Sequence, residues 1–141
     1  MNYNSLINLK NKVEKMDYTE KLIKALKHPR ALKRREAAWL LGLKKDIKAV
    51  EPLIEVLNSN DDPYVLANAA ESLGKIGNSN AIYALIKSLE SSYVLVRGKS
   101  ALALGEIGEY SAMDALNKAL KDNNKYVRDM AKEALSKIYD S

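Results

Sequence analysis

One five-residue pattern occurs twice in this chain and constrains its fold more than any other feature. The sequence Leu-Gly-Lys-Ile-Gly at residues 73–77 returns 31 residues later as Leu-Gly-Glu-Ile-Gly at residues 104–108. The same register extends back to Leu22 and forward to Leu135, with one extra residue in the loop between Leu57 and Val65. A period near 30 residues is typical of stacked structural units. We therefore expect a repeat protein that acts by binding along an extended surface.

Each repeat contains two apolar patterns of helical type, separated by a turn that contains glycine. Residues 50–57 are apolar at the first, fourth, fifth and eighth positions, which is the stripe of an amphipathic helix, and residues 82–89 repeat it. A hairpin of two such helices cannot bury its apolar stripe alone, so neighbouring hairpins must share a core. These patterns predict an all-α fold, a short α-solenoid of stacked antiparallel hairpins with about nine helices.

The whole chain, residues 1–141, is expected to form a single domain. Its predicted parts are an N-terminal cap helix over 1–16 and helical pairs over 17–43, 47–75, 80–106 and 111–139. Leu6, Leu9, Val13 and Met16 have helical spacing but do not fit the repeat, as is usual for a terminal cap.

Two large apolar residues occupy repeat positions that are mostly polar elsewhere. Trp39 aligns with Glu71, Leu102 and Glu133, and we expect the cap helix to cover it rather than leave it exposed as a partner anchor. Met130 aligns with Glu36, Asn68 and Lys99. Met130 is thus predicted to be either a surface residue or part of a dimer contact through the C-terminal helix, with the monomer favoured.

Composition narrows the class of protein. The chain is 47% hydrophobic and 29% charged, which is ordinary for a globular domain. No apolar run approaches the roughly 18 residues of a membrane span, and residues 1–5 lack the features of a signal peptide. There is no Cys, so disulfides and thiol chemistry are excluded. We expect a cytoplasmic protein without membrane contact.

The repeat resembles a known family. The string Val96-Arg97, Ser100-Ala101, Leu104-Gly105, Ile107-Gly108, then Ala112 and Leu116, is similar to the short HEAT-like repeat of the phycocyanobilin-lyase type. The resemblance covers roughly residues 30–139 and is weakest where Lys44 and Lys45 replace the Ile and Gly. It implies a right-handed superhelix with first helices on the convex side and second helices lining the concave side. Most members of this family are interaction modules, and some are bilin lyase subunits or a diiron hydroxylase.

Few residues offer reaction chemistry. A single His, His28, cannot supply the several His-Glu pairs of a diiron site, a multi-His zinc site or a His-based triad. Asp61 and Asp62 beside Pro63 are typical of a turn and a helix cap. Arg34, Arg97 and Arg128 share a repeat position, and we expect them to bond an acid or a carbonyl near the hairpin turn. The sequence predicts a non-enzymatic protein without a cofactor, with a bilin-lyase-like chaperone subunit as a minor alternative.

Charge supports a second alternative. Residues 1–48 contain 13 Lys and Arg against 5 Asp and Glu, a net charge of +8, whereas residues 49–141 have a net charge of −3. A basic end could neutralise nucleic-acid phosphates, contact an acidic protein, or only keep the solenoid soluble. The candidate cationic residues are Lys24, Lys27, Arg30, Lys33, Arg34, Arg35, Lys44, Lys45 and Lys48.

The favoured function is that of a protein-interaction or scaffold module. If Leu53, Leu85 and Leu116 face the core, the residues on the opposite side of the second helices form a mixed-charge strip on the concave surface. This candidate partner-binding strip contains Glu51, Glu55, Tyr83, Lys87, Asp114 and Lys118. Exposed Tyr is frequent among interface anchors. The sequence does not identify the partner, the pathway or the oligomeric state.

Overall fold

The structure is a computed structural model that describes residues 2–140, and all regular elements in this range are helical. The α-helices are α1 (Tyr3–Lys15), α2 (Tyr18–Ala25), α3 (Ala31–Lys44), α4 (Val50–Leu57), α5 (Pro63–Ile76), α6 (Ile82–Ser88), α7 (Val94–Ile107), α8 (Met113–Ala119) and α9 (Lys125–Tyr139). Short 3-10 turns η1 (Ile47–Ala49), η2 (Ser79–Ala81) and η3 (Tyr110–Ala112) precede α4, α6 and α8. Within this range, no helix is both long and apolar enough to span a bilayer.

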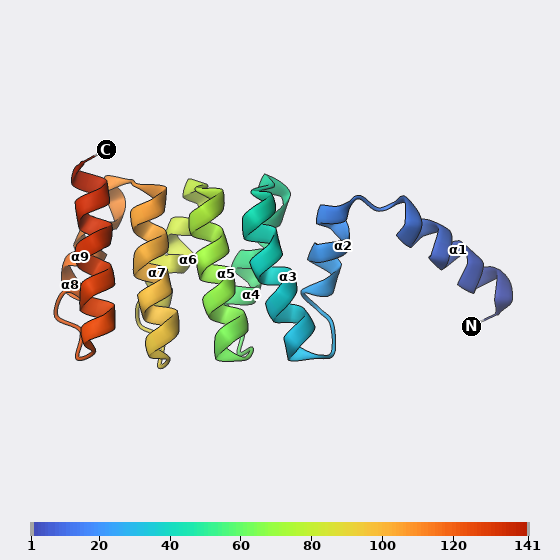
Figure 1. Cartoon of the computed structure of the whole chain (residues 1–141), viewed down its shortest axis with the longest axis horizontal. Coiled ribbons are helices and arrows are strands. Elements are labelled where there is room, and N and C mark those ends of the chain that lie inside the picture. The colour runs from blue at the N-terminus through green and yellow to red at the C-terminus, as the bar shows by residue number, and fades with distance from the viewer. Residues whose placement is uncertain (1, 141) are drawn as a thin grey trace.

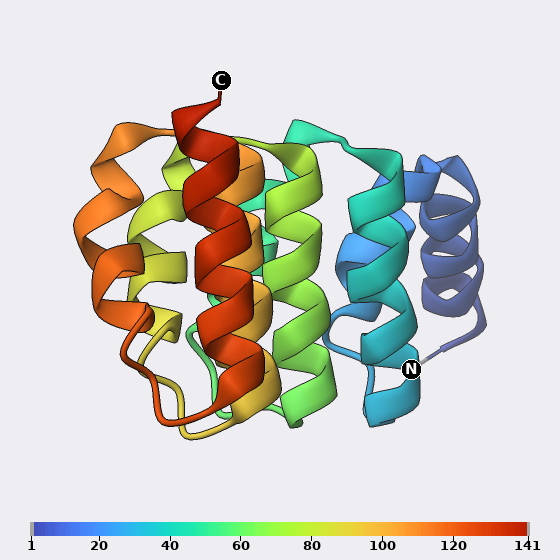
Figure 2. The same cartoon turned by 60° about the vertical axis from the view of Figure 1, so that its left-hand side comes forward.

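Helices α2 to α9 form a stack of two layers. The first helices of the repeats, α3, α5, α7 and α9, lie side by side in one layer, and each packs against the next (Figure 1). The second helices, α2, α4, α6 and α8, form the other layer, and each packs on the first helix that follows it (Figure 2). This arrangement is a short α-solenoid of stacked antiparallel hairpins, as the sequence predicts.

A left-handed residue ends each of the first helices α3, α5 and α7. Gly77 and Gly108 have φ of 76° and 78°, which a residue without a Cβ adopts at little cost. Lys45 takes the same place after α3 with φ of 53°. A 3-10 turn follows each of these residues and uses part of the second apolar stripe. The α-helical parts of α4, α6 and α8 therefore span only seven or eight residues.

The first helices approach each other at small residues. A Cβ added to Gly74 would lie 2.7 Å from the Ala103 Cα, and one added to Gly105 would lie 2.5 Å from the Ala134 Cα. Side chains in this column would thus push neighbouring repeats apart. Leucines fill the core on either side of these contacts, and the fully buried ones include Leu41, Leu53, Leu73, Leu85, Leu104 and Leu116. The predicted facing of Leu53, Leu85 and Leu116 is confirmed.

Helix α1 corrects one prediction. It leaves the stack beyond α2 (Figure 1), and its side chains, including Leu6 and Leu9, are exposed; the side chain of Val13 lies outside the described part. Trp39 is 45% exposed, and the Lys75 ammonium lies over its ring, 5.9 Å from the centroid. Glu14 aligns with Lys45, Gly77 and Gly108, but among the described residues α1 has no left-handed residue that would turn the chain back onto the stack.

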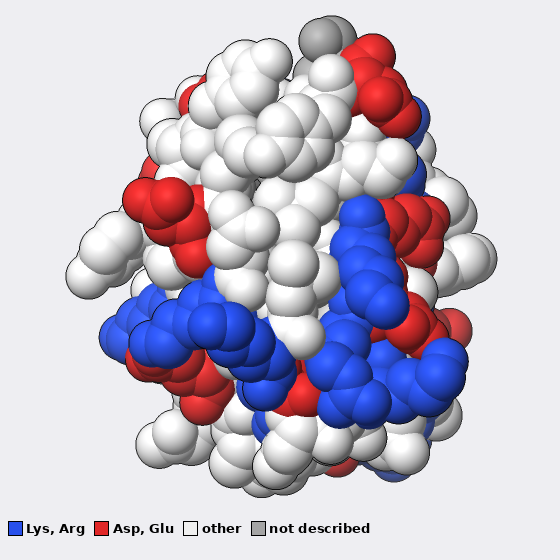
Figure 3. Space-filling model, turned by 90° about the vertical axis from the view of Figure 1, so that its left-hand side faces the viewer, with Lys and Arg blue, Asp and Glu red and all other residues white. Residues whose placement is uncertain are grey.

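Met130 also differs from its prediction. Its column faces the preceding first helix, as the hydrogen bond from Asn68 to the Arg35 carbonyl shows. Met130 is therefore half-buried against the core rather than directed to solvent. This placement removes the reason for a dimer contact built on Met130. The outer face of the stack at α8 and α9 has an uncharged centre flanked by groups of both charges (Figure 3).

Candidate partner-binding site

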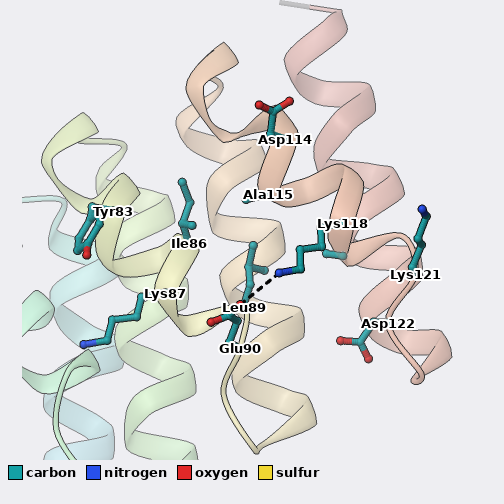
Figure 4. Close-up of a pocket in the computed structure, with 11 residues that line it drawn as sticks. Tyr83, Ile86, Lys87, Leu89, Glu90, Asp114, Ala115, Lys118, Lys121 and Asp122 are labelled. Carbon is teal, nitrogen blue, oxygen red and sulfur yellow. Dashed lines mark hydrogen bonds and ion pairs between the residues drawn. The ribbon is translucent and has the colours of Figure 1, made fainter.

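A groove opens between the second helices α6 and α8. Its volume is ≈ 840 Å³, enough for several side chains of a partner. The apolar lining comes from both helices: Ile86 of α6 and Leu89 just after it, and Ala115 and Ala119 of α8. Figure 4 shows Tyr83 on the α6 side, with Asp114 and Lys118 projecting from α8. The small side chains of Ala115 and Ala119 leave space that longer ones would fill.

Tyr83 is the most exposed large apolar residue among those described. Its side chain is 81% exposed on the wall of the groove, although it follows the buried Ile82 directly. A ring in this position can cover apolar area of a partner while its hydroxyl stays hydrated. The geometry therefore places a rigid aromatic group beside an apolar floor.

Charged groups surround this groove. Lys118 of α8 reaches Glu90 beyond the end of α6, with 3.5 Å between Nζ and Oε1, and this pair spans the groove (Figure 4). Both side chains are well exposed, so the pair contributes little to stability and can separate for a partner. Lys87, Asp114 and Lys121 complete a rim of mixed charge.

Asp122 lies at one end of the groove and is fixed there by hydrogen bonds. Its carboxylate accepts two hydrogen bonds from the Arg97 guanidinium and one from the Asn124 backbone N–H. Hydrogen bonding from Arg97 is the main cause that lowers the pKa of Asp122, against the opposing effect of burial. Arg34 binds Asp61 in the same way, and Arg128 donates to the Asp122 carbonyl. The expected bonds of this arginine row to acids and carbonyls are confirmed.

The predicted strip is divided by the structure. Tyr83, Lys87, Asp114 and Lys118 line the groove between α6 and α8. Glu55 lines a separate groove between α2 and α4, together with Ile23, Lys27 and Pro52. Glu51 is exposed but lines neither groove. A third hollow lies between the two grooves, sharing Lys87 with the first and Asp61 with the second.

Several groove residues were not predicted as part of a site. Ile86 and Leu89 belong to the apolar stripe that the sequence assigns to the core, yet they are only half-buried. Ile23 and Ile54, at the same repeat position as Ile86, are also half-buried, so this column lies at the edge of the core. A signal was present in Ala115 and Ala119, because small residues on a second helix create space beside its neighbour.

The predicted basic patch is not a single surface. Arg34 is largely buried against Asp61 and the His28 and Pro29 carbonyls, so it does not belong to the patch. Arg35 lies over the Tyr64 ring, 4.6 Å from its centroid. Lys33 and Lys44 stand near opposite ends of α3, roughly 16 Å apart along the axis at 1.5 Å per residue. The remaining lysines are therefore spread over the N-terminal end.

The two layers, the short second helices and their grooves define a class, the α-helical repeat proteins. No group of acidic, His or Cys side chains that could hold a metal occurs within the described residues. The sequence profile of HEAT repeats matches residues 19–97 and 82–141. The chain belongs to the HEAT repeat family.

Comparison with individual proteins supports the expected resemblance to the phycocyanobilin-lyase type. The chain is 45% identical over 69 residues to phycocyanobilin lyase subunit alpha of Microchaete diplosiphon. This match covers 43% of the chain and 24% of the relative, so the chain spans about a quarter of that protein's length.

Three solved structures share the fold. An engineered protein has a TM-score of 0.70 at 27% identity, covering 87% of this chain and 63% of its own. The complex of CpcE and CpcF of phycocyanin lyase from Nostoc sp. PCC7120 has a TM-score of 0.63 at 22% identity, covering 89% and 66%. Human deoxyhypusine hydroxylase has a TM-score of 0.77 at 24% identity, covering 90% and 45%.

Proposed function

We infer that this chain is a non-enzymatic protein-interaction module that holds a partner on its second helices. The observation that supports it best is Tyr83, a highly exposed ring on the wall of an apolar-floored groove. Interface anchors are enriched in Tyr and sit beside pockets, with polar groups around them. The HEAT repeat family supplies a scaffold suited to this role.

The groove also suggests what kind of segment it accepts. Ile86, Leu89, Ala115 and Ala119 favour apolar side chains, and the rim has both lysines and acids. A short peptide segment with one or two apolar anchors and charges of both signs fits this surface. Rim charges contribute mainly to specificity and association rate, whereas Tyr83 and the floor contribute affinity.

Site-specific photo-crosslinking tests this proposal. A benzophenone amino acid replaces Tyr83 in one variant and Tyr110 in the other, because Tyr110 is also an exposed tyrosine but lies outside both grooves. We expect a discrete protein adduct from cell extract at position 83 and none at position 110. Tyr83→Ala should then weaken binding of the captured protein by roughly 30-fold, the effect of losing a 2 kcal/mol anchor. Identical adducts at both positions would contradict the proposal.

A second candidate function is that of a bilin lyase-like chaperone subunit. The 45% identity to phycocyanobilin lyase subunit alpha favours it. In that case the groove would serve a bilin or its acceptor protein, and the chain would work beside a second subunit. Adding purified phycocyanobilin and recording its absorption spectrum tests this function. A red-shifted band that Tyr83→Ala weakens would support it, and an unchanged spectrum would argue against a bilin site on this chain.

Nucleic-acid binding through the basic N-terminal third is less favoured. Its support is the exposure of Lys24, Lys27, Arg30 and Lys45, whereas Arg34 is held by Asp61. Phosphate contacts would make log K fall linearly with log salt, with a slope of about −0.7 per contact on a single strand. The absence of a mobility shift on RNA or DNA at low salt would end this alternative.

A further inference from the structure

The two ends of the stack differ in the residues they present. In the interior of the stack, each first helix packs against the next one through small residues at fixed repeat positions. Ala38, Ala70 and Ala101 are examples, and all three are fully buried. On α9, Lys132 occupies the repeat position of these alanines, and Ser136 occupies that of Gly74 and Gly105. Both are exposed. Polar outer faces of this kind are characteristic of capping repeats.

The opposite end, on α3, is apolar where a capping repeat would be polar. Contacts in the interior identify the columns that face the preceding first helix. The Tyr126 ring packs at Gly98, Ser72 donates to the Ala38 carbonyl, and Lys75 lies over Trp39. In α3 these columns hold Leu32, Leu40 and Leu43.

No first helix covers these three leucines, because α1 points away from the stack (Figure 1). Leu32 is 63% exposed and Leu43 is 51% exposed, whereas Leu40 is half-buried. Their spacing along α3 matches one face of a helix, so they form a stripe of the width that another helix occupies. We call Leu32, Leu40 and Leu43 the α3 end stripe.

Helix α2 adds positive charge beside this stripe. Lys21 and Lys24 occupy the columns of Pro52 and Glu55, which line the groove toward the preceding second helix. They therefore face the same end of the stack. Both side chains are exposed, and neither forms an ion pair with a described residue. Two acidic groups lie near this face: Glu36, which forms an ion pair with Lys33 at 3.5 Å, and the exposed Glu20, one turn before Lys24 on α2.

Charge decides between the occupants of this surface. Residues 1–48 have a net charge of +8, so a second copy that docks through the same end would bring like charges together. Helix α1 of the same chain carries Lys10, Lys12 and Lys15 against one acid, Glu14, and has the same disadvantage. A second copy that docks through α9 would set the polar Lys132 and Ser136 against the leucines. A helix with acidic flanks meets neither obstacle.

We propose that the α3 end stripe, with Lys21 and Lys24, is a docking slot for an acidic amphipathic helix of a protein partner. The helix takes the place that a preceding first helix would occupy and covers Leu32, Leu40 and Leu43 with its apolar stripe. Its carboxylates lie toward Lys21 and Lys24. This slot is separate from the groove at Tyr83, so each surface can be tested without the other.

Fluorescence anisotropy with the full chain tests the slot. The probe is a labelled 18-residue helical peptide with leucines on one face and glutamates on both flanks; the control peptide replaces every glutamate with lysine. We expect the acidic peptide to bind at least about tenfold more tightly. Leu32→Ser with Leu43→Ser should remove most of this binding, and Lys21→Glu with Lys24→Glu should reverse the preference.

Matched controls keep the result interpretable. Tyr83→Ala and Lys132→Glu, on the groove and on the opposite end, should leave peptide affinity unchanged, and circular dichroism should show intact helices in every variant. Equal binding of both peptides, or no loss in the double leucine variant, would overturn the proposal. So would sedimentation velocity showing a dimer of the unmodified chain that the same leucine substitutions dissociate.

Discussion

The Arg97 guanidinium meets the Asp122 carboxylate in two hydrogen bonds, 2.9 Å from Nε to Oδ2 and 3.2 Å from Nη2 to Oδ1. Arg97 also donates to the Ser91 carbonyl, so it ties the first turn of α7 both to the loop between α6 and α7 and to the loop between α8 and α9. Arg34 on α3 and Asp61 in the loop after α4 form the same bond near the N-terminal end of the stack. In the repeat between them, Leu66 replaces the arginine.

This pair predicts a dependence of stability on pH. The pKa of Asp122 is lowered in the folded state, mainly by hydrogen bonding from Arg97, and that of Asp61 is lowered by Arg34. A lowered carboxyl pKa contributes stability that is present above the unfolded pKa and is lost as the pH falls through the folded pKa. We expect the urea midpoint to fall on acidification below about pH 4.

Asp122→Asn tests the origin of that effect. At neutral pH the substitution should cost about 1.5–3 kcal/mol of unfolding free energy, the range for hydrogen bonds to charged groups. It should also flatten the acid-side loss of stability in urea titrations. Asp114→Asn, on the exposed rim of the groove, is the control and should change neither quantity. Equal pH profiles for the native chain and Asp122→Asn would contradict the assignment.

The core and surface faces of α6 predict unequal costs. Leu85→Ala should lower the unfolding free energy by about 2–5 kcal/mol, because the packed repeats on both sides cannot close the cavity. Tyr83→Ala should cost less than about 1 kcal/mol, since its ring is exposed. Chemical denaturation of both variants measures the difference. Similar losses of unfolding free energy would mean that the Tyr83 ring packs against the rest of the fold rather than standing free in solvent.

The glycine column predicts an effect opposite to helix propensity. Gly74→Ala would favour an isolated helix by about 1 kcal/mol. In the stack its Cβ meets the Ala103 backbone at 2.7 Å, so we expect destabilisation of about 1–3 kcal/mol. Ser136→Ala lies in the same column at the exposed end and should stay within about 0.5 kcal/mol. A stabilised Gly74→Ala chain in thermal unfolding would show that the first helices are packed more loosely.

Trp39 predicts a distinct fluorescence response. Because its ring is 45% exposed and α1 does not cover it, acrylamide should quench it in the intact chain. A chain that starts at Asp17 should have the same emission maximum and the same quenching constant. Protection that disappears on this deletion would instead show that α1 folds back over Trp39 in solution.

Local patterns were sufficient for the repeat and its facing. Leu53, Leu85 and Leu116 recur at one position of a helical stripe, and burial of apolar area is the dominant favourable contribution to folding, so their core placement follows from spacing alone. Gly77 and Gly108 mark turns for an equally local reason, since the left-handed conformation disfavours a Cβ.

Contacts between repeats were decided only by the tertiary structure. The sequence assigns Ile86 and Leu89 to the core, but both are half-buried at its edge and line a groove. It groups Arg34 with exposed lysines, but the fold brings Asp61 to within 2.8 Å of it. The burial of Met130 and of Trp39 depends on which neighbouring helix lies against each side chain. A periodic sequence determines which face of a helix is buried, whereas the partner of each face depends on how far the next helix extends and where it turns.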